Sequence, residues 1–153
     1  NPAPDAGLVG RIFLRDRLVV VASPALPPPT DGASVPAVLR GSIGQAETWD
    51  ITAAAGPSTL TVQPVLGLSS LVMVRDAVRM GAGVARLPLS LVSPDLAAGR
   101  LVRWGDVESV EIALWALYPT RRLLSARVSA FLDYLREAFP QGTPDELAAY
   151  VTE

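Results

Sequence analysis

The chain of 153 residues contains no cysteine, no histidine and no lysine, and all 13 of its basic residues are arginine. Without cysteine there is no disulfide framework and no thiol chemistry. Without histidine the chain lacks the commonest general base, the commonest metal ligand and the Ser–His–Asp triad. The absence of lysine removes a Ser–Lys dyad and a Schiff base. An enzyme is therefore the least favoured class of protein, and we expect no catalytic residue, no metal and no cofactor.

Charge and long apolar runs are also scarce. Charged residues make up 18% of the chain and the net charge is −2, which gives no electrostatic footprint for nucleic acid. No apolar run approaches the roughly 18 residues of a membrane span, so we expect no membrane partner. Half of the residues are hydrophobic, enough for the core of one domain or two small lobes. The chain starts at Asn1 and not at Met, which indicates missing upstream sequence.

Residues 69–88 carry the clearest pattern, a helix that turns through glycine into a strand. Ser69 is a natural N-cap, and apolar residues recur behind it at helical spacing. Gly81 suits a left-handed residue at the helix end. The pattern predicts a helix from Ser69 to about Met80, followed by a buried strand over 84–87. The first amides of such a helix are free donors beside a partial positive charge, where an anion or a polar ligand group can dock.

The rest of the chain predicts a mixture of strands and helices. Apolar and alternating segments predict strands over 8–14, 18–22, 42–46, 48–52, 59–63, 101–104 and 110–118. Residues 35–40 suggest one helical turn with Pro36 at its first position, and 89–98 suggest short helical pieces broken at Pro94. Ser125 caps a helix with an apolar stripe, and a capping box at 143–146 predicts a small helix after it.

Other residues that could carry chemistry have a simpler structural interpretation. Asp106, Glu108 and Glu111 are expected in a solvated loop and at a strand start, not in an acid pair or a metal site. The remaining candidates are interpreted as core or interface (Trp49 and Trp115), as surface (Arg40 and Gln63) and as a solvated turn (Arg121 and Arg122).

The run over 69–88 resembles the effector-binding domain of LysR-type transcriptional regulators. In that family a polar residue starts a helix, and a Gly-Ala/Leu-Gly turn leads into an apolar strand that ends in proline. Four further segments resemble the family in the same order: LVVVASP at 18–24, DLAAGRL at 95–101, WALYPTRR at 115–122 and the helix at 128–139. Together they extend the resemblance over residues 8–139.

The resemblance implies an α/β fold of the type II periplasmic-binding-protein kind, with two lobes joined by two crossing strands. Residues 1–21 and 106–140 would form a partial first lobe, residues 22–105 the second lobe, and residues 141–153 a tail with a short helix. The start of the first lobe and the winged helix-turn-helix domain would precede Asn1, so this chain should not bind DNA by itself. In the family, a small effector sits in the cleft between the lobes.

The resemblance also implies effector contacts, at strand ends and at a helix start. These residues are Ala22, Ser23, Ile43, Ser69, Ser70, Leu87 and Pro88. The helix start would favour an anionic effector. The resemblance further implies a cytoplasmic protein that forms a homodimer or a larger oligomer and reaches DNA only through the missing N-terminal domain.

A second class of protein stays open at this point. Solute-binding receptors of transport systems share the architecture, and an upstream signal peptide in place of a helix-turn-helix would favour them. Residues 110–118 are apolar almost without interruption, as in a strand covered on both faces. Because the helix at 128–139 covers one face only, we expect the chain not to be a self-sufficient monomer.

Overall fold

The computed structural model describes residues 8–30, 32–119 and 125–152. The chain forms two compact units: unit 1 takes Asn1–Asp16 and Glu111–Glu153, and unit 2 takes Arg17–Val110. Two long strands, β1 (Leu8–Ala22) and β6 (Val102–Pro119), contribute residues to both units. Each was expected as two shorter strands, which is wrong. The polar pair Arg15-Asp16 suggested a break, but Arg15 is exposed and Asp16 is buried, as the two faces of one strand require.

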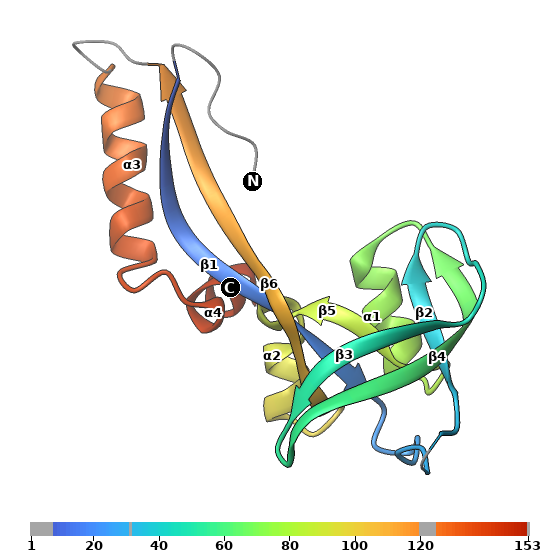
Figure 1. Cartoon of the computed structure of the whole chain (residues 1–153). Helices are drawn as coiled ribbons and strands as arrows, with labels where there is room; N and C mark the ends of the chain where they lie inside the picture. Colours follow the sequence, from blue (N-terminus) through green and yellow to red (C-terminus); the bar gives the residue numbers. More distant parts are fainter. Residues whose placement is uncertain (1–7, 31, 120–124, 153) are drawn as a thin grey trace. The chain divides into compact units, whose positions relative to one another are not determined.

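The sheet has the strand order β2-β4-β3-β6-β1-β5 (Figure 1). Its other members are β2 (Val35–Arg40), β3 (Glu47–Ala53), β4 (Gly56–Leu68) and β5 (Ala85–Pro88). β2 and β4 are parallel, whereas β3 pairs antiparallel with β4 and β5 antiparallel with β1. Val84, just before β5, also bridges to Ala37 of β2 in parallel. The first and last strands of the sheet are thereby joined.

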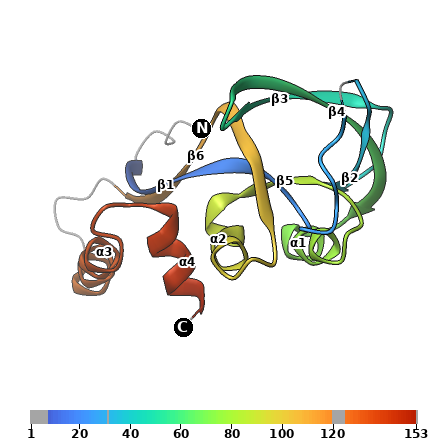
Figure 2. The ribbon, with the colours of Figure 1, turned by 90° about the horizontal axis from the view of Figure 1, so that it is seen from below.

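Apolar residues cover both faces of the sheet in unit 2. On one face, helices α1 (Leu71–Arg79) and α2 (Leu89–Ala97) pack on Val19 and Val21 of β1. On the other face, Val20 and Ala22 pack with Trp49 of β3 and residues of β4. Figure 2 shows this layering, with α1 and α2 on one side of β5 and β3 on the other. All four residues of β1 at positions 19–22 are fully buried.

The predicted helix, turn and strand over 69–88 are confirmed, with the cap one residue later than expected. Ser70 is the N-cap, and its hydroxyl accepts a hydrogen bond from the Met73 amide at 3.3 Å. Gly81 has a φ of 87°, the left-handed conformation that ends a helix. Val84 and two of the four residues of β5 are buried.

Two predictions at prolines are wrong, for the same reason. Residues 35–40 form strand β2, because Val84 donates to the Pro36 carbonyl at 2.8 Å and accepts from the Val38 amide at 2.8 Å. Pro94 does not break the second helix, since α2 continues through it to Ala97. In both places the packing of distant segments outweighs the local preference of proline. The predicted end at Gly99 is confirmed by its φ of 74°.

The strand expected at 42–46 is absent, and the strand expected at 59–63 is longer, since β4 spans Gly56–Leu68. Residues 42–46 are exposed connecting residues, with no strand among them. The predicted strands at 48–52 and 59–63 are confirmed as β3 and β4, joined by a tight turn before Gly56. All five residues of 42–46 are exposed, Ile43 included at 52%, so no buried face holds this segment as a strand of the sheet.

Unit 1 combines the other halves of β1 and β6 with α3 (Ala126–Ala138) and α4 (Pro144–Thr152). The Ser125 cap is confirmed, with its hydroxyl accepting from the Val128 amide at 3.3 Å. The capping box is confirmed too: the Thr143 hydroxyl accepts from the Glu146 amide, and a Glu146 carboxylate oxygen accepts from the Thr143 amide. Among the described helices, none is long and apolar enough to cross a membrane.

A charge cluster ties α1 to α2 in unit 2. Asp95 of α2 is only 4% exposed, and its carboxylate accepts from Nε of Arg100 at 2.6 Å. Arg75 and Arg79, one turn apart on α1, approach the same carboxylate at 3.9 and 3.6 Å. A buried carboxylate needs such partners, because burial without them is costly.

The turn between α1 and β5 offers a matched pair of glycine substitutions. A Cβ at Gly83 would lie 2.6 Å from the Pro36 carbonyl oxygen, whereas a Cβ at Gly81 would meet nothing within 4 Å. We expect Gly83→Ala to lower the free energy of unfolding by about 2–3 kcal/mol, through overpacking against β2. Gly81→Ala should cost about 1 kcal/mol, from its left-handed backbone alone. Urea unfolding followed by circular dichroism measures both, and equal losses would contradict the proposed contact.

Asp95→Asn tests the charge cluster. The substitution keeps the size of the side chain but leaves three arginines without the buried carboxylate, so we expect a loss of about 2–3 kcal/mol in unfolding free energy. Asp76→Asn is the control, because Asp76 pairs with the same two α1 arginines from an exposed position. It should change stability by less than about 0.5 kcal/mol. Similar losses in the two variants would show that burial of Asp95 is unimportant.

Candidate functional site

The carboxyl ends of β2, β4 and β5 meet at one edge of the sheet in unit 2. β2 ends at Arg40, which is level with Leu68 at the end of β4, and the Gly41 amide donates to the Leu68 carbonyl at 2.7 Å. The bridge between Ala37 and Val84 sets β5 in the same direction, so Pro88 also lies at this edge. We call it the carboxyl edge. In open α/β sheets, ligands bind beyond the carboxyl ends of the strands.

Five of the seven predicted effector contacts lie at the carboxyl edge. Ser69 and Ser70 follow β4 directly, and Leu87 and Pro88 are the last residues of β5. Ile43 belongs to the loop after β2, where its Cγ2 would be 3.2 Å from a Cβ built on Gly67 of β4. Residues from three separate segments are thus brought together.

The start of α1 supplies the polar groups of this edge. The Ser70 hydroxyl is engaged with Met73, which leaves the amides of Leu71 and Val72 as donors at the helix end. No acidic residue stands in the first turn to neutralise them. The partial positive charge of the helix end favours an anion or a carbonyl oxygen here.

Apolar side chains border the same edge. Ile43, Val72 and Met73 are each about half exposed, at 52%, 48% and 49%. Leu87, in contrast, is fully buried in the core, so it can offer a ligand only its backbone. The edge therefore combines helix amides and serine hydroxyls with an apolar border, which suits a small organic molecule that carries a polar or charged group.

The other two predicted contacts, Ala22 and Ser23, lie at the opposite end of the β1–β5 ladder. Leu18 is paired with Pro88 and Val21 with Ala85, so β1 ends where β5 begins. Four residues of strand separate Ala22 from the level of Pro88, about 13 Å at 3.3 Å per residue. Strand direction places them apart, and the sequence pattern contains no signal for it.

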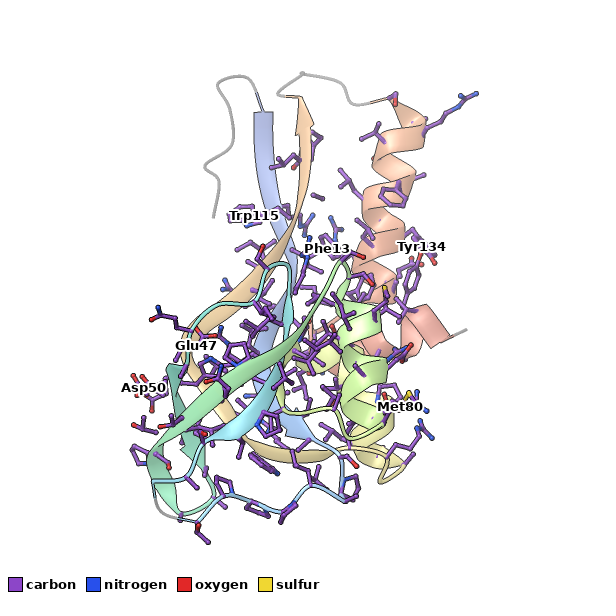
Figure 3. All side chains as sticks on the ribbon, turned by 90° about the vertical axis from the view of Figure 1, so that its right-hand side faces the viewer. Phe13, Glu47, Asp50, Met80, Trp115 and Tyr134 are labelled. Carbon is purple, nitrogen blue, oxygen red and sulfur yellow. The ribbon has the colours of Figure 1, made fainter. Side chains whose placement is uncertain are left out.

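Ser23 instead borders a shallow cavity together with the arginines of the charge cluster and Met80. Its hydroxyl accepts a hydrogen bond from the Ala25 amide at 3.2 Å. Met80, at the end of α1, projects outward and is 88% exposed (Figure 3). The arginines at this cavity were not among the predicted site residues. The spacing of Arg75 and Arg79 by one helical turn was the available signal.

The other candidate residues behave as structural side chains. The three acids take separate partners: Asp106 pairs with Arg103, Glu108 accepts from the Thr52 hydroxyl, and Glu111 pairs with Arg15. Within the described ranges there is no group of three acids that could hold a metal ion. Trp49 is 2% exposed and belongs to the core, while Arg40 and Gln63 lie on the surface. Arg121 and Arg122 fall outside the described residues.

Similar proteins identify the family. The family model of the LysR substrate binding domain matches residues 1–140. Among curated proteins, the HTH-type transcriptional regulator PtxR of Pseudomonas aeruginosa is 32% identical over 144 residues, which are 87% of this chain and 45% of PtxR. TrpI of the same organism, also an HTH-type transcriptional regulator, is 33% identical over 131 residues, 80% of this chain and 43% of TrpI. The chain spans less than half the length of these relatives.

Solved structures agree with this result. The regulatory domain of CrgA, a LysR-type transcriptional regulator from Neisseria meningitidis, has a TM-score of 0.69 at 25% identity, over 91% of this chain and 72% of that one. The regulatory domain of AphB from Vibrio vulnificus has the same fold, with a TM-score of 0.64 at 23% identity, over 88% and 72% of the two chains.

These proteins are transcriptional regulators, so a transport receptor is not favoured. The α/β fold of the type II periplasmic-binding-protein kind, implied by the sequence, is confirmed by the match to LysR regulatory domains. The chain belongs to the LysR substrate binding domain family.

Proposed function

We propose that this domain binds a small organic anion at the carboxyl edge of unit 2, with Ser69 and Ser70 as its polar contacts. The observation that carries the proposal is the convergence of three strand ends on the start of α1. Free helix amides favour an anionic group, and the half-exposed border of Ile43, Val72 and Met73 suits its apolar body. Pro88 borders the same edge, whereas Ala22 and Ser23 would take part only if the ligand reached the far end of the strands.

The rest of the function follows from membership in the family. We assign unit 1 to the partial first lobe and unit 2 to the second lobe, with the expected boundaries near residues 21 and 106 moved to those of the two units. Effector binding would change the grip of a linked helix-turn-helix domain on DNA, in the cytoplasm, without catalysis. A shift in affinity requires that the effector bind one conformation of the regulator more tightly than another.

A thermal-shift screen of amino acids, carboxylates and sugar phosphates tests the proposal, because a ligand that binds the folded state raises the melting temperature. We expect organic anions to give the largest shifts. If neutral compounds alone raised the melting temperature, the anionic character of the site would be wrong.

Ser70→Ala tests the contact itself. For the strongest ligand from the screen, we expect calorimetric titration to show a loss of about 0.5–1.5 kcal/mol in binding free energy, as for one neutral hydrogen bond. Ser125→Ala is the matched control, because it removes the same kind of helix cap in unit 1. Both variants should lose about 1 kcal/mol of helix stability, and only the first should lose affinity. Unchanged affinity in Ser70→Ala would remove Ser70 from the site.

The apolar surface of unit 1 supports self-association. Phe131 is 56% exposed, Tyr134 47% and Leu117 48%, although these residue types are usually covered. Because the family resemblance implies a homodimer and this apolar surface would be covered in one, we propose that the chain forms a homodimer.

Light scattering at tens of micromolar should therefore give about twice the chain mass of 16.1 kDa. Phe131→Glu should yield the monomer, since a charge would be buried in the interface. Ala130→Glu, which adds the same charge at the neighbouring exposed position of α3, should leave the dimer intact. A stable monomer of the unmodified chain would contradict the proposal.

A further inference from the structure

We infer that unit 1 contains a second ligand site, between β1 and α3, for a small organic anion with an apolar body. A cavity of about 240 Å³ opens there, lined by β1, α3 and the turn that leads to α4. All of its lining residues belong to unit 1, whereas the seven predicted effector contacts all belong to unit 2. The inference does not depend on the proposed function of the carboxyl edge.

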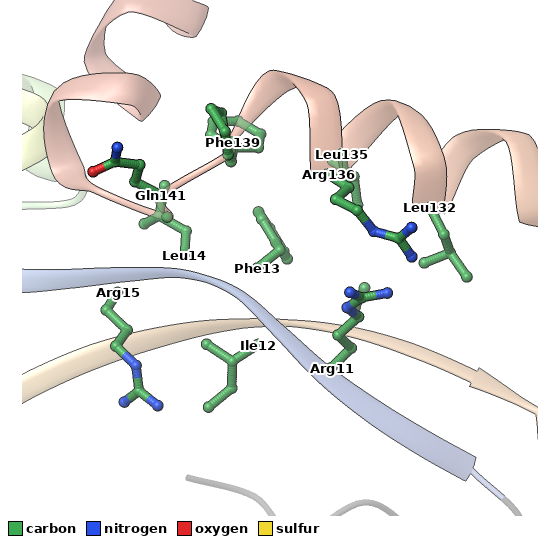
Figure 4. A pocket seen from close by; sticks show the side chains of 13 residues that line it. Arg11, Ile12, Phe13, Leu14, Arg15, Leu132, Leu135, Arg136, Phe139 and Gln141 are labelled. Carbon is green, nitrogen blue, oxygen red and sulfur yellow. The ribbon is translucent and has the colours of Figure 1, made fainter.

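The floor of the cavity is apolar. Phe13 of β1 and Phe139, just beyond α3, lie with ring centroids 5.6 Å apart, and Leu132 and Leu135 of α3 line the same space. In Figure 4 the side chains of Phe13, Leu135 and Phe139 occupy the space between the strand and the helix. Such a lining gains free energy when it takes up an apolar ligand body.

Two guanidinium groups stand at the mouth of this cavity. Figure 4 shows Arg11 of β1 and Arg136 of α3 extending toward each other, whereas Arg15 points to the other side of β1. Arg15 has its own partner, Glu111, at 2.9 Å. Arg11 has no hydrogen bond or ion pair with any residue in the described part of the chain, and Arg136 meets Asp133 only at 3.7 Å in an exposed pair.

The arrangement of charges selects the ligand. Two like charges near an apolar surface repel each other, and an anion placed between them removes that repulsion. Guanidinium groups bind carboxylates through paired hydrogen bonds. A ligand with a carboxylate and an apolar tail would therefore place the carboxylate between the two arginines and the tail on the apolar floor.

The turn at residues 140–142, between α3 and α4, completes the lining of the cavity and is hydrogen-bonded to β1. The Gly142 carbonyl accepts a hydrogen bond from the Arg15 amide at 2.9 Å. The Gln141 amide donates to Glu146 at the start of α4, at 3.0 Å. Because the family match ends at residue 140, this turn extends beyond the part that the family model describes. The site is thus built partly from Gln141 and Gly142, which follow the matched residues.

Calorimetric titration of the 153-residue chain with 4-phenylbutanoate tests the inference. We expect saturable binding with a Kd of about 1 mM or tighter, which is modest for a ligand of this size. The neutral 4-phenylbutan-1-ol and inorganic sulfate should each bind at least about tenfold more weakly, because each has only half of the required chemistry.

Variants locate the site. Arg11→Gln and Arg136→Gln should each weaken 4-phenylbutanoate binding about tenfold, and Arg11→Lys, which keeps the charge but loses the paired hydrogen bonds, should weaken it by less than Arg11→Gln does. Arg127→Gln is the matched control, since Arg127 is an exposed arginine of α3 that does not line the cavity. It should change the affinity by less than about twofold. Circular dichroism should show that all four variants keep the fold, because the substituted side chains are exposed.

Several results would overturn the inference. They are an absence of saturable binding up to about 10 mM, equal binding of the alcohol or of sulfate, and equal affinity in Arg11→Gln and Arg127→Gln. Binding that is lost in Ser70→Ala but kept in Arg11→Gln would place the ligand at the carboxyl edge, which would support the proposed function and overturn the second site.

Discussion

The structure of unit 2 depends on four consecutive residues of β1 that must be buried on both faces. Val19 and Val21 point to one face of the sheet and Val20 and Ala22 to the other, and none of them is exposed. A strand of this kind is stable only between two covering layers. Helices α1 and α2 supply one layer. On the second face, residues of the β3–β4 hairpin, which belongs to the same sheet, pack on Val20 and Ala22, with Trp49 among them. The elements that follow β1 along the chain, from β2 to α2, provide these covering residues.

The same requirement positions the candidate effector site. For α1 to cover the sheet, the chain must leave β4 at its carboxyl end, run back along the face and re-enter the sheet at Val84. The start of α1 is thereby fixed next to the ends of β2, β4 and β5. Packing of Val74 and Val78 in the core holds the helix there, so its amides are pre-organised for a ligand. The position of the site thus follows from the packing of α1 on the sheet.

The amino-acid composition limits how this protein can recognise a ligand. Without histidine, lysine or cysteine, the only charged side chains available are carboxylates and arginine. Arginine keeps its charge at all physiological pH values and is suited to carboxylates. In unit 2 three arginines are used to neutralise the buried Asp95 and join two helices. In unit 1 Arg11 has no such structural partner among the described residues, which distinguishes it from the arginines whose role is stability.

The sequence by itself determined the features that depend on neighbouring residues, and through them the family. The cap at Ser125, the capping box of Thr143 and Glu146 and the glycine turn at Gly81 were all predictable, because each is stabilised by contacts within a few residues. Only the tertiary structure decided that residues 35–40 form a strand and that β1 and β6 are continuous, since these depend on hydrogen bonds to distant segments. It also decided that Ser69 and Ser70 lie with Pro88 while Ser23 lies at the other end. Strand direction is fixed by long-range pairing, and the local pattern of a strand is the same in both directions.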